Sequence, residues 1–445
     1  MDVGTCLADR RRYERQIERL HQRHLMTSRL YELRQDDVSL ASIVLHRARV
    51  ARLLARDVSS GAYALQPGEL RTIKARNKLR EVYSCRLTDL IVHGVVADLV
   101  REAVAPTLSP RVFSYRKGTS WTAPIAQFAA WVRATRAAQP DVRERGVYVL
   151  RCDVDSYTDS IPLGPSSPLW AMLGPHLGYP LHPVVHEVIK TTMRVPGGAV
   201  ASRDLGLPMG QPIAPVLANL YLGELDAALA AVPGGFYARY GDDFLFAHPD
   251  PAAVCAGIAT TDAVLARLAL TANERKRQVV YLTPPGRPSD GWPAARGAPA
   301  VQFLGTRVDA TGTIGLDHPK VRAVLREVDR RSAATVRTVG RRGREEAGRA
   351  VCAVVNRALD PRGQLTQQRS AILLRRVVTD RAQLRQLDHR IAQIVASAVT
   401  GRAGPRAFRE VPYRTLREEW GLVSLVAARN ACRSSRTNGT FGRTY

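Results

Sequence analysis

Closely spaced cysteines are missing from this chain, although it is 445 residues long and contains six cysteines. No two of them have the CxxC spacing of a zinc or redox motif, and a chain of this length does not need disulfide bonds to hold its core. We therefore expect reduced thiols, which are typical of an intracellular protein. The first 16 residues carry charges where a secretory signal peptide needs an apolar core, which argues against secretion.

An uninterrupted apolar run long enough to cross a membrane is also missing. One long run without a charge covers residues 205–223, and Pro208, Pro212 and Pro215 interrupt it. A transmembrane helix needs about 20 consecutive apolar residues, and proline breaks a helix interior. The sequence therefore predicts no membrane partner and a cytoplasmic location.

Acidic residues are scarce relative to basic ones. The chain has 40 Asp and Glu against 65 Lys and Arg, which gives a formal net charge of +25 and a pI near 10.6. Such an excess attracts polyanions, so nucleic acid is the first candidate partner. The composition is otherwise globular, because 45% hydrophobic and 24% charged residues exclude wholesale disorder. At about 100–200 residues per domain, we expect two to four domains.

Hydrophobic periodicity predicts strands in the middle of the chain and helices at both ends. Residues 146–150 have the pattern of a buried strand, and hairpins with tight turns are expected over residues 236–247 and 301–316. Helices are expected over residues 10–20, 39–54, 216–231 and 252–268 and, rich in arginine, over most of 319–399.

Three carboxylates fall where these strands end. Asp153 follows the strand at 146–150, and Asp242 and Asp243 occupy the tight turn of the first hairpin. If the strands pair in one sheet, the carboxylates converge at its edge, where like charges repel unless a cation lies among them. Mg²⁺ prefers such oxygen ligands, and two ions about 3.5–4 Å apart activate a 3′-hydroxyl and stabilise the leaving pyrophosphate. A basic chain around an acidic centre is what a nucleotidyltransferase needs.

Five segments, in this order, carry a resemblance to a known family. They are LRCDVDSYTDSIP (150–162), GLPMGQPIAPVLANLYLGELD (206–226), RYGDDFL (239–245), LTANERK (270–276) and VQFLG (301–305), preceded by fingers-like segments within 78–92 and 114–120. From about Leu70 to Leu316 the chain resembles the reverse transcriptases of the prokaryotic branch, which includes group II intron, retron, diversity-generating and defence-associated enzymes.

The resemblance implies an α+β fold, the right-hand polymerase. Its fingers and palm combine an antiparallel sheet with helices, and an α-helical thumb follows. The expected boundaries are 1–69 for a basic helical extension, 70–145 for the fingers, 146–318 for the palm, 319–400 for the thumb and 401–445 for a C-terminal extension and tail.

The resemblance also implies roles for residues at matching positions. Catalysis and metal ligation fall to Asp153, Asp242 and Asp243, with the backbone carbonyl of Val154 as a further ligand; two Mg²⁺ ions are implied, and Mn²⁺ is an alternative. The residues expected to hold the nucleotide are Lys78, Arg80, Tyr157, Thr158, Gly210, Gln211 and Lys276. Those expected to hold primer or template are Arg116, Lys117, Tyr240, Phe303, Leu304 and Gly305.

Thr158 and Met209 are among the positions that depart from the family pattern. The fifth residue after Asp153 is Thr158, where the family usually has a large aromatic ring that excludes the ribose 2′-hydroxyl, and Tyr157 stands one place earlier. We expect sugar discrimination to be weaker, or to be rebuilt with Tyr157. Met209 occupies the place of a frequent glutamine, which replaces a polar contact near the nucleotide by an apolar one.

The function that the resemblance implies is RNA-directed DNA synthesis, with an RNA template, dNTPs and a DNA product. The long basic ends favour a defence-associated enzyme that binds a dedicated non-coding RNA and acts against phage, and a group II intron or retron enzyme stays open. The alternative from a different class is an RNA-binding, maturase-like protein that does not require polymerase activity. Protein priming from Tyr445 is a further alternative, and the oligomeric state stays open.

Overall fold

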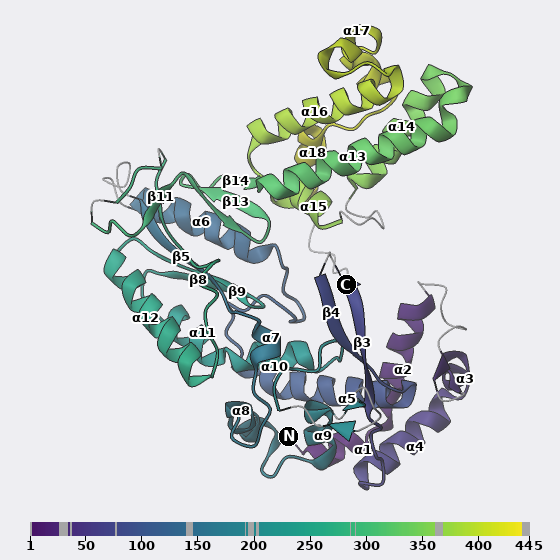
Figure 1. Ribbon diagram of the computed structural model, residues 1–445, viewed down its shortest axis with the longest axis vertical. Helices are drawn as coiled ribbons and strands as arrows, with labels where there is room; N and C mark the ends of the chain where they lie inside the picture. The colour runs from purple at the N-terminus through teal and green to yellow at the C-terminus, as the bar shows by residue number, and fades with distance from the viewer. Residues whose placement is uncertain are drawn as a thin grey trace. The chain divides into compact units, whose positions relative to one another are not determined.

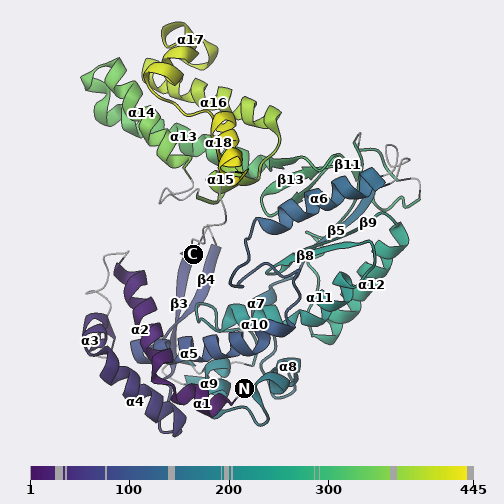
Figure 2. The same cartoon turned by 180° about the vertical axis from the view of Figure 1, so that it is seen from behind.

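The structure is a computed structural model that describes residues 2–25, 34–35, 38–75, 78–138, 146–191, 193–194, 200–201, 204–284, 286–289, 291–360 and 368–437. The chain divides into two compact units, and both contain helices and strands (Figures 1 and 2). Unit 1 comprises Met1–Thr119, Leu150–Phe246 and Ala252–Gln278, and unit 2 comprises Ser120–Val149, Ala247–Pro251 and Val279–Tyr445. The α+β class is as predicted, and the predicted domain boundaries stay predictions.

The N-terminal segment of unit 1 packs on a long buried helix, α5 (Leu87–Val104). This segment contains α1 (Val3–Ala8), α2 (Arg10–Leu25), the short strands β1 (Arg34–Gln35) and β2 (Val38–Ser39), α3 (Leu40–Leu45) and α4 (Arg47–Ser59). Helix α2 buries Tyr13 and Ile17 and approaches α5 closely, because a Cβ on Gly94 would lie 2.6 Å from the Gln16 side chain. The basic segment that was predicted as an extension is therefore packed into unit 1.

A four-stranded sheet of order β4-β3-β6-β7 lies in the same unit. Strands β3 (Gly68–Ala75) and β4 (Lys78–Ser84) pair antiparallel over their whole length, whereas β6 (Met193–Arg194) and β7 (Val200–Ala201) are two-residue strands. Helices α8 (Pro168–Leu177) and α9 (Pro183–Lys190) contact α5. Helix α5 is therefore the element against which much of unit 1 is assembled.

The strands that carry the predicted acidic residues are hydrogen-bonded neighbours in the order β5-β9-β8. Strand β5 (Val147–Asp153) begins in unit 2 and ends in unit 1, and β8 (Phe236–Tyr240) and β9 (Asp243–His248) form the predicted hairpin. Figure 1 shows α11 (Gly223–Ala230) and α12 (Pro251–Arg267) on one side of β8 and β9. The helix predicted over 216–231 is two helices, α10 (Ala214–Tyr221) and α11, with Leu222 between them.

The strands of unit 2 form two groups. In the first group, β10 (Gln278–Leu282) lies between β5 and β11 (Arg296–Ala298), and β10 and β11 run parallel. Strands β12 (Ala300–Phe303), β13 (Thr306–Asp309) and β14 (Ile314–Leu316) form an antiparallel meander. The hairpin predicted over 301–316 is present between β13 and β14, and Leu304 and Gly305, with φ of 50° and 81°, add an earlier turn that brings in β12 as a third strand. Helix α6 (Ala123–Ala138) contacts this meander through β13 and β14.

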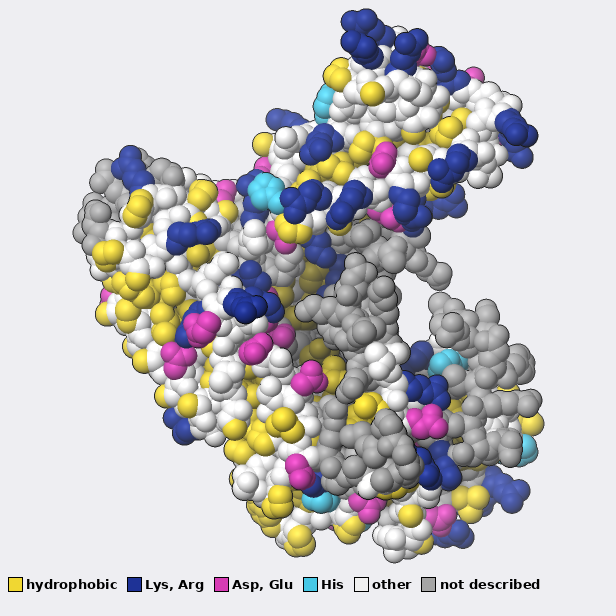
Figure 3. All heavy atoms as spheres, viewed as in Figure 1, with side chains coloured by type: hydrophobic (Ala, Val, Ile, Leu, Met, Phe, Trp, Pro, Cys, Tyr) yellow, Lys and Arg dark blue, Asp and Glu magenta, His cyan; other side chains and the backbone are white. Residues whose placement is uncertain are grey.

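The rest of unit 2 is helical and basic. Its helices are α13 (His318–Val339), α14 (Arg344–Ala358), α15 (Gln368–Ile372), α16 (Arg381–Thr400), α17 (Ala407–Glu410) and α18 (Leu425–Thr437). Helix α13 contacts α14 and α16 through a buried stripe that includes Val324 and Val328. From residue 319 onward the sequence holds 27 Lys and Arg against 10 Asp and Glu, and Figure 3 shows the basic side chains gathered over these helices. Within the described ranges, no helix has the length and apolarity that crossing a membrane requires.

Candidate active site

Asp153 and the turn of the β8–β9 hairpin lie side by side, where strand β5 ends and strand β9 begins. The backbone amide of Val154 donates to the carbonyl of Asp242 at 3.4 Å, which joins the end of β5 to the hairpin turn. The amide of Asn273 donates to the carbonyl of Asp153 at 2.7 Å from the other side. Gly241 occupies the turn with φ of 70°, a left-handed conformation that favours glycine. The fold thus brings together carboxylates that lie about 90 residues apart in the sequence.

The hairpin carboxylates lie in an unfavourable electrostatic environment. Burial is the largest cause that raises the pKa of Asp242 above its ordinary value, and the negative charges of Asp153 and Asp243 raise it further. Burial also raises the pKa of Asp243, and the charge of Arg151 opposes that shift. The ionised carboxylates are therefore short of positive charge, which is a deficit that a bound cation relieves.

Two basic side chains already lie against this acidic group. The ammonium of Lys276 lies 2.5 Å from Oδ2 of Asp153, and this hydrogen bond raises the pKa of Lys276. Arg151 holds Asp243 through two bonds of 3.2 Å, from Nε to Oδ1 and from Nη2 to Oδ2. Arg151 is not among the residues predicted from the sequence, although its position two residues before Asp153 on the same strand places both side chains on one face.

The donor chemistry suits a divalent ion, although the carboxylates are engaged by Lys276 and Arg151. No group of three or more His, Cys, Asp or Glu side chains arranged around a common metal position occurs in the part of the chain that the structure describes. The oxygens of Asp153 and Asp242 are hard ligands of the kind that Mg²⁺ prefers, and the Lys276 ammonium marks a place where positive charge is stable. Asp153 and Asp242 therefore fit the implied ions best, while Asp243 is committed to Arg151.

The predicted nucleotide loop, 206–215, is fastened to the segment after Asp153. The amide of Leu207 donates to the carbonyl of Thr158 at 2.7 Å, and the amide of Gly206 donates to the carbonyl of Ile161 at 2.8 Å. Thr158 is half-buried in the short helix α7 (Tyr157–Ser160), and Gly210 is exposed with φ of 94°. The fold thus joins this loop to the chain segment that follows the first aspartate.

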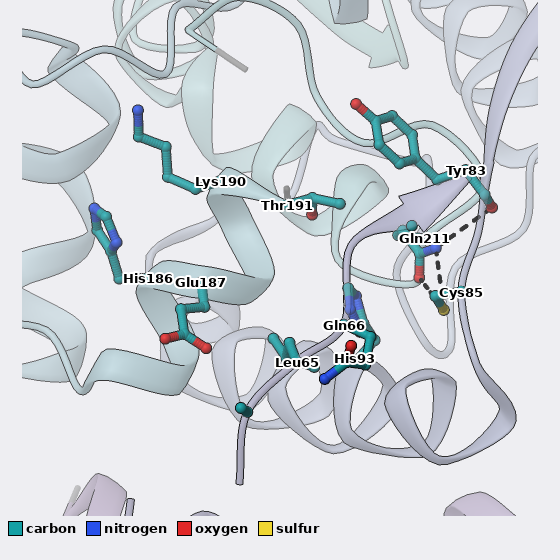
Figure 4. A pocket seen from close by; sticks show the side chains of 12 residues that line it. Leu65, Gln66, Tyr83, Cys85, His93, His186, Glu187, Lys190, Thr191 and Gln211 are labelled. Carbon is teal, nitrogen blue, oxygen red and sulfur yellow. Dashed lines mark hydrogen bonds between the residues drawn. The ribbon is translucent and has the colours of Figure 1, made fainter. Parts of the chain in front are cut away.

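The polar atoms of Gln211, a predicted nucleotide contact, are engaged within the protein. Its side chain is buried, and its amide nitrogen donates to the carbonyl of Tyr83 at 3.4 Å and to the sulfur of Cys85 at 3.5 Å. Figure 4 shows these bonds at the wall of a cavity of about 310 Å³ that Lys190 and Thr191 also line. The amide of Tyr83 in turn donates to the carbonyl of Met209 at 3.0 Å. This geometry argues against direct nucleotide binding by Gln211, because its polar atoms fasten the loop to β4.

Tyr157 does not take the place of the missing aromatic ring. Its side chain is buried, and its hydroxyl donates to the carbonyl of Ala218 in α10 at 2.5 Å. Burial raises the pKa of Tyr157 far above its ordinary value, so the hydroxyl stays protonated. This core position argues against a contact between Tyr157 and the nucleotide sugar, and the contact predicted for Thr158 stays a prediction.

Other predicted contacts are placed as follows. The side chains of Lys78 and Arg80 lie outside the described residues, and only their backbone in β4 is placed. Arg116 is half-buried and donates to the carbonyls of Ser109 at 2.5 Å and Val112 at 3.3 Å, so that guanidinium holds its own loop. Lys117 is exposed, and Tyr240 is half-buried at the end of β8.

The predicted primer contacts in VQFLG lie in unit 2. Phe303 is fully buried, so its ring is a core side chain, which argues against a contact between that ring and the primer. Leu304 and Gly305 form the turn between β12 and β13, and a Cβ on Gly305 would meet the Lys320 side chain at 3.0 Å. The accessible residues of this segment are therefore Gln302, which is exposed, and the half-buried Leu304 and Gly305.

The amino-acid sequence matches the model of a known protein family. Residues 74–308, more than half of the chain, match the sequence model of the family described as reverse transcriptase (RNA-dependent DNA polymerase). No curated protein sequence matches the chain.

Three solved structures with 11% sequence identity are similar to this chain. Apo telomerase from Candida tropicalis truncated from its C-terminal domain has a TM-score of 0.42, with 57% of this chain and 56% of that one covered. Apo telomerase from Candida tropicalis has a TM-score of 0.44, with 80% and 69% covered. Telomerase from Candida albicans in complex with a TWJ fragment of telomeric RNA has a TM-score of 0.43, with 83% and 66% covered. The chain thus spans little more than half of the length of the first of these.

Proposed function

The chain belongs to the reverse transcriptase family, and from that membership we propose that it is an RNA-directed DNA polymerase whose metal-binding carboxylates are Asp153 and Asp242. The family has the right-hand polymerase fold, so the predicted fold class is confirmed. The observation that carries the proposal is the 3.4 Å bond between Val154 and Asp242, which places the two aspartates at adjoining strand ends.

Two divalent ions at this place would supply Lewis-acid activation of the primer 3′-hydroxyl and stabilisation of the departing pyrophosphate. The protein's own contribution is to hold the carboxylates, and the carbonyl of Val154 is a further proposed ligand. Arg151 neutralises Asp243, which lowers repulsion within the group without occupying Asp242. Lys276 is 58% exposed on a flexible side chain, so we propose that it leaves Asp153 when ions bind and contacts the triphosphate.

Sugar selection follows from the core position of Tyr157. Because that ring is fixed against Ala218, only the small Thr158 side chain remains at the place where relatives carry a large ring. We therefore propose that discrimination against ribonucleotides is weak. Gly210, whose backbone is exposed, can approach the base or sugar closely because it lacks a Cβ.

The test is incorporation of labelled dNTP on an RNA template with a DNA primer in the presence of Mg²⁺. We expect incorporation by the wild type and a loss of at least about 10²-fold in Asp153→Asn and Asp242→Asn, since removing even an outer partner of a metal ligand costs 10–100-fold. Asp155→Asn is the matched control, because Asp155 is exposed and its carboxylate accepts a bond from Asn273 at 3.3 Å. Equal activity in all variants would contradict the proposal.

The biological setting is a separate proposal. We propose that the enzyme belongs to the prokaryotic branch, works in the cytoplasm on a dedicated non-coding RNA and acts against phage. The support is the sequence resemblance and the basic helices from residue 319 onward, which offer a surface for phosphates. Sequencing of copurified RNA and plaque counts in cells with wild type or Asp242→Ala/Asp243→Ala test it. A single abundant RNA and a loss of protection in the variant are expected, whereas equal protection would favour an RNA-binding role.

A further inference from the structure

A fully buried ion pair lies beneath the hairpin turn. Arg239 in β8 is the largest fully buried side chain within the described ranges, and Asp226 in α11 is equally buried. The two groups make a bidentate pair, from Nε to Oδ1 at 2.7 Å and from Nη2 to Oδ2 at 2.6 Å. The hydroxyl of Tyr237 also donates to Oδ1 of Asp226 at 2.8 Å. The carboxylate of Asp226 is therefore held by both Arg239 and Tyr237.

The remaining donors of Arg239 reach backbone carbonyls at both ends of the network. Nη1 donates to the carbonyl of Gly241 at 2.9 Å, and Nη2 donates to the carbonyl of Asn219 in α10 at 3.0 Å. Gly241 directly precedes Asp242, whose own carbonyl accepts the bond from Val154. The peptide that carries the metal-binding carboxylate is thus held from the helix side by Arg239 and from the strand side by Val154.

Stability alone does not explain why this pair is buried. Removing two charges from water is costly, and buried ion pairs are often matched or exceeded in stability by well-packed apolar residues. Burial lowers the pKa of Arg239, but the charge of Asp226 more than offsets this, and the net pKa lies above the ordinary value. The guanidinium therefore stays charged. The turn itself has open space where a Cβ of Gly241 would lie, so packing on that side does not hold it.

We propose that Arg239, held by Asp226, is a positioning residue that fixes the Gly241–Asp242 peptide and thereby sets the affinity of the acidic group for divalent ions. This inference deepens the proposed function and rests on it for the identity of the ions. A lysine at the same place keeps the charge but has a single ammonium, which cannot reproduce the planar fork that joins Asp226, Asn219 and Gly241.

The first test is the Mg²⁺ dependence of nucleotide incorporation in Arg239→Lys. We expect the half-saturating Mg²⁺ concentration to rise about tenfold or more, as for other residues that orient metal ligands, and the rate at saturating Mg²⁺ to recover to within about threefold. A residue that only supports the fold would lower the maximal rate and leave the Mg²⁺ dependence unchanged, which would overturn the proposal. Arg267→Lys is the matched control, because Arg267 pairs with Glu224 of the same helix α11 at the surface.

The second test does not depend on polymerase activity. Binding of Mn²⁺ to protein without nucleic acid, followed by the electron paramagnetic resonance signal of free Mn²⁺, is expected to weaken about tenfold in Arg239→Lys and to stay unchanged in Arg267→Lys. Equal Mn²⁺ affinity in Arg239→Lys and wild type would overturn the inference. If wild type binds Mn²⁺ through Asp242 and incorporates no nucleotide, the proposed function fails while the positioning role stands.

A milder variant covers the case in which Arg239→Lys does not fold. Tyr237→Phe removes only the hydroxyl bond to Asp226 and keeps the ring and the ion pair. We expect a smaller weakening of Mn²⁺ binding, about two- to threefold, in the same direction. No change, in a variant whose circular dichroism matches wild type, would count against the coupling between Asp226 and the hairpin turn.

Discussion

The buried pair beneath the hairpin gives the sharpest stability prediction. Asp226→Asn keeps the size of the side chain but leaves the guanidinium of Arg239 without a counter-charge. Both side chains are 0% exposed, so water cannot replace the lost partner. Removing one member of such a pair costs about 3–5 kcal/mol. We expect a loss of this size in the free energy that holds β8 and β9 closed.

The assay is amide hydrogen exchange of the β8 and β9 backbone in metal-free protein, because it reports local opening even when two compact units unfold separately. A loss of about 3–5 kcal/mol corresponds to exchange that is faster by at least about 100-fold. Glu224→Gln is the control on the same helix, since its pair with Arg267 is about half exposed and is worth about 1 kcal/mol or less. Equal exchange in Asp226→Asn and Glu224→Gln would refute the reasoning.

Three further predictions follow from the turn and the gate. In metal-free protein Asp242→Asn is expected to be more stable than wild type at pH 7. The pKa of Asp242 is raised in the folded protein, so the unfolded chain binds fewer protons and the stability of wild type falls as pH rises. Chemical denaturation should show the difference in stability closing towards about pH 4, and a variant less stable than wild type at pH 7 would contradict this. Gly241→Ala is expected to cost about 1–2 kcal/mol in the same assay through its φ of 70° alone, since its Cβ meets no atom within 4 Å, and unchanged stability would contradict this. Thr158→Phe is expected to increase the ratio of kcat/KM for dNTP to that for rNTP at least about tenfold. If wild type already rejects rNTP by more than about 10⁴-fold and the variant is unchanged, the proposal of weak sugar discrimination is refuted.

The parts of the site that sequence predicted are those set by local patterns. An apolar β-rich run before Asp153 and a glycine turn before Asp242 are signals within a few residues, and the strands β5, β8 and β9 form there. The sequence predicts that the carboxylates converge only if these strands pair in one sheet. The backbone bond between Val154 and Asp242 shows that the strand ends do adjoin.

The parts that sequence did not predict depend on contacts between distant segments. Tyr157 could face the nucleotide or the core, and only its bond to Ala218 decides for the core. Phe303 likewise has the pattern of either a primer contact or a core residue, and burial decides. Arg239 lies within a recognised motif, but its partner Asp226 is 13 residues away on a helix, so no spacing rule indicated the pair.

The central claim is that Asp153 and Asp242 hold divalent ions between adjoining strand ends. Anomalous diffraction from crystals with Mn²⁺, a primer on an RNA template and an unreactive dNTP analogue tests it most directly. We expect two anomalous peaks about 3.5–4 Å apart, each with an oxygen of Asp153 or Asp242 in its coordination sphere. Peaks held by other residues, or carboxylates of Asp153 and Asp242 more than about 12 Å apart, too far for a shared pair of ions, would contradict it.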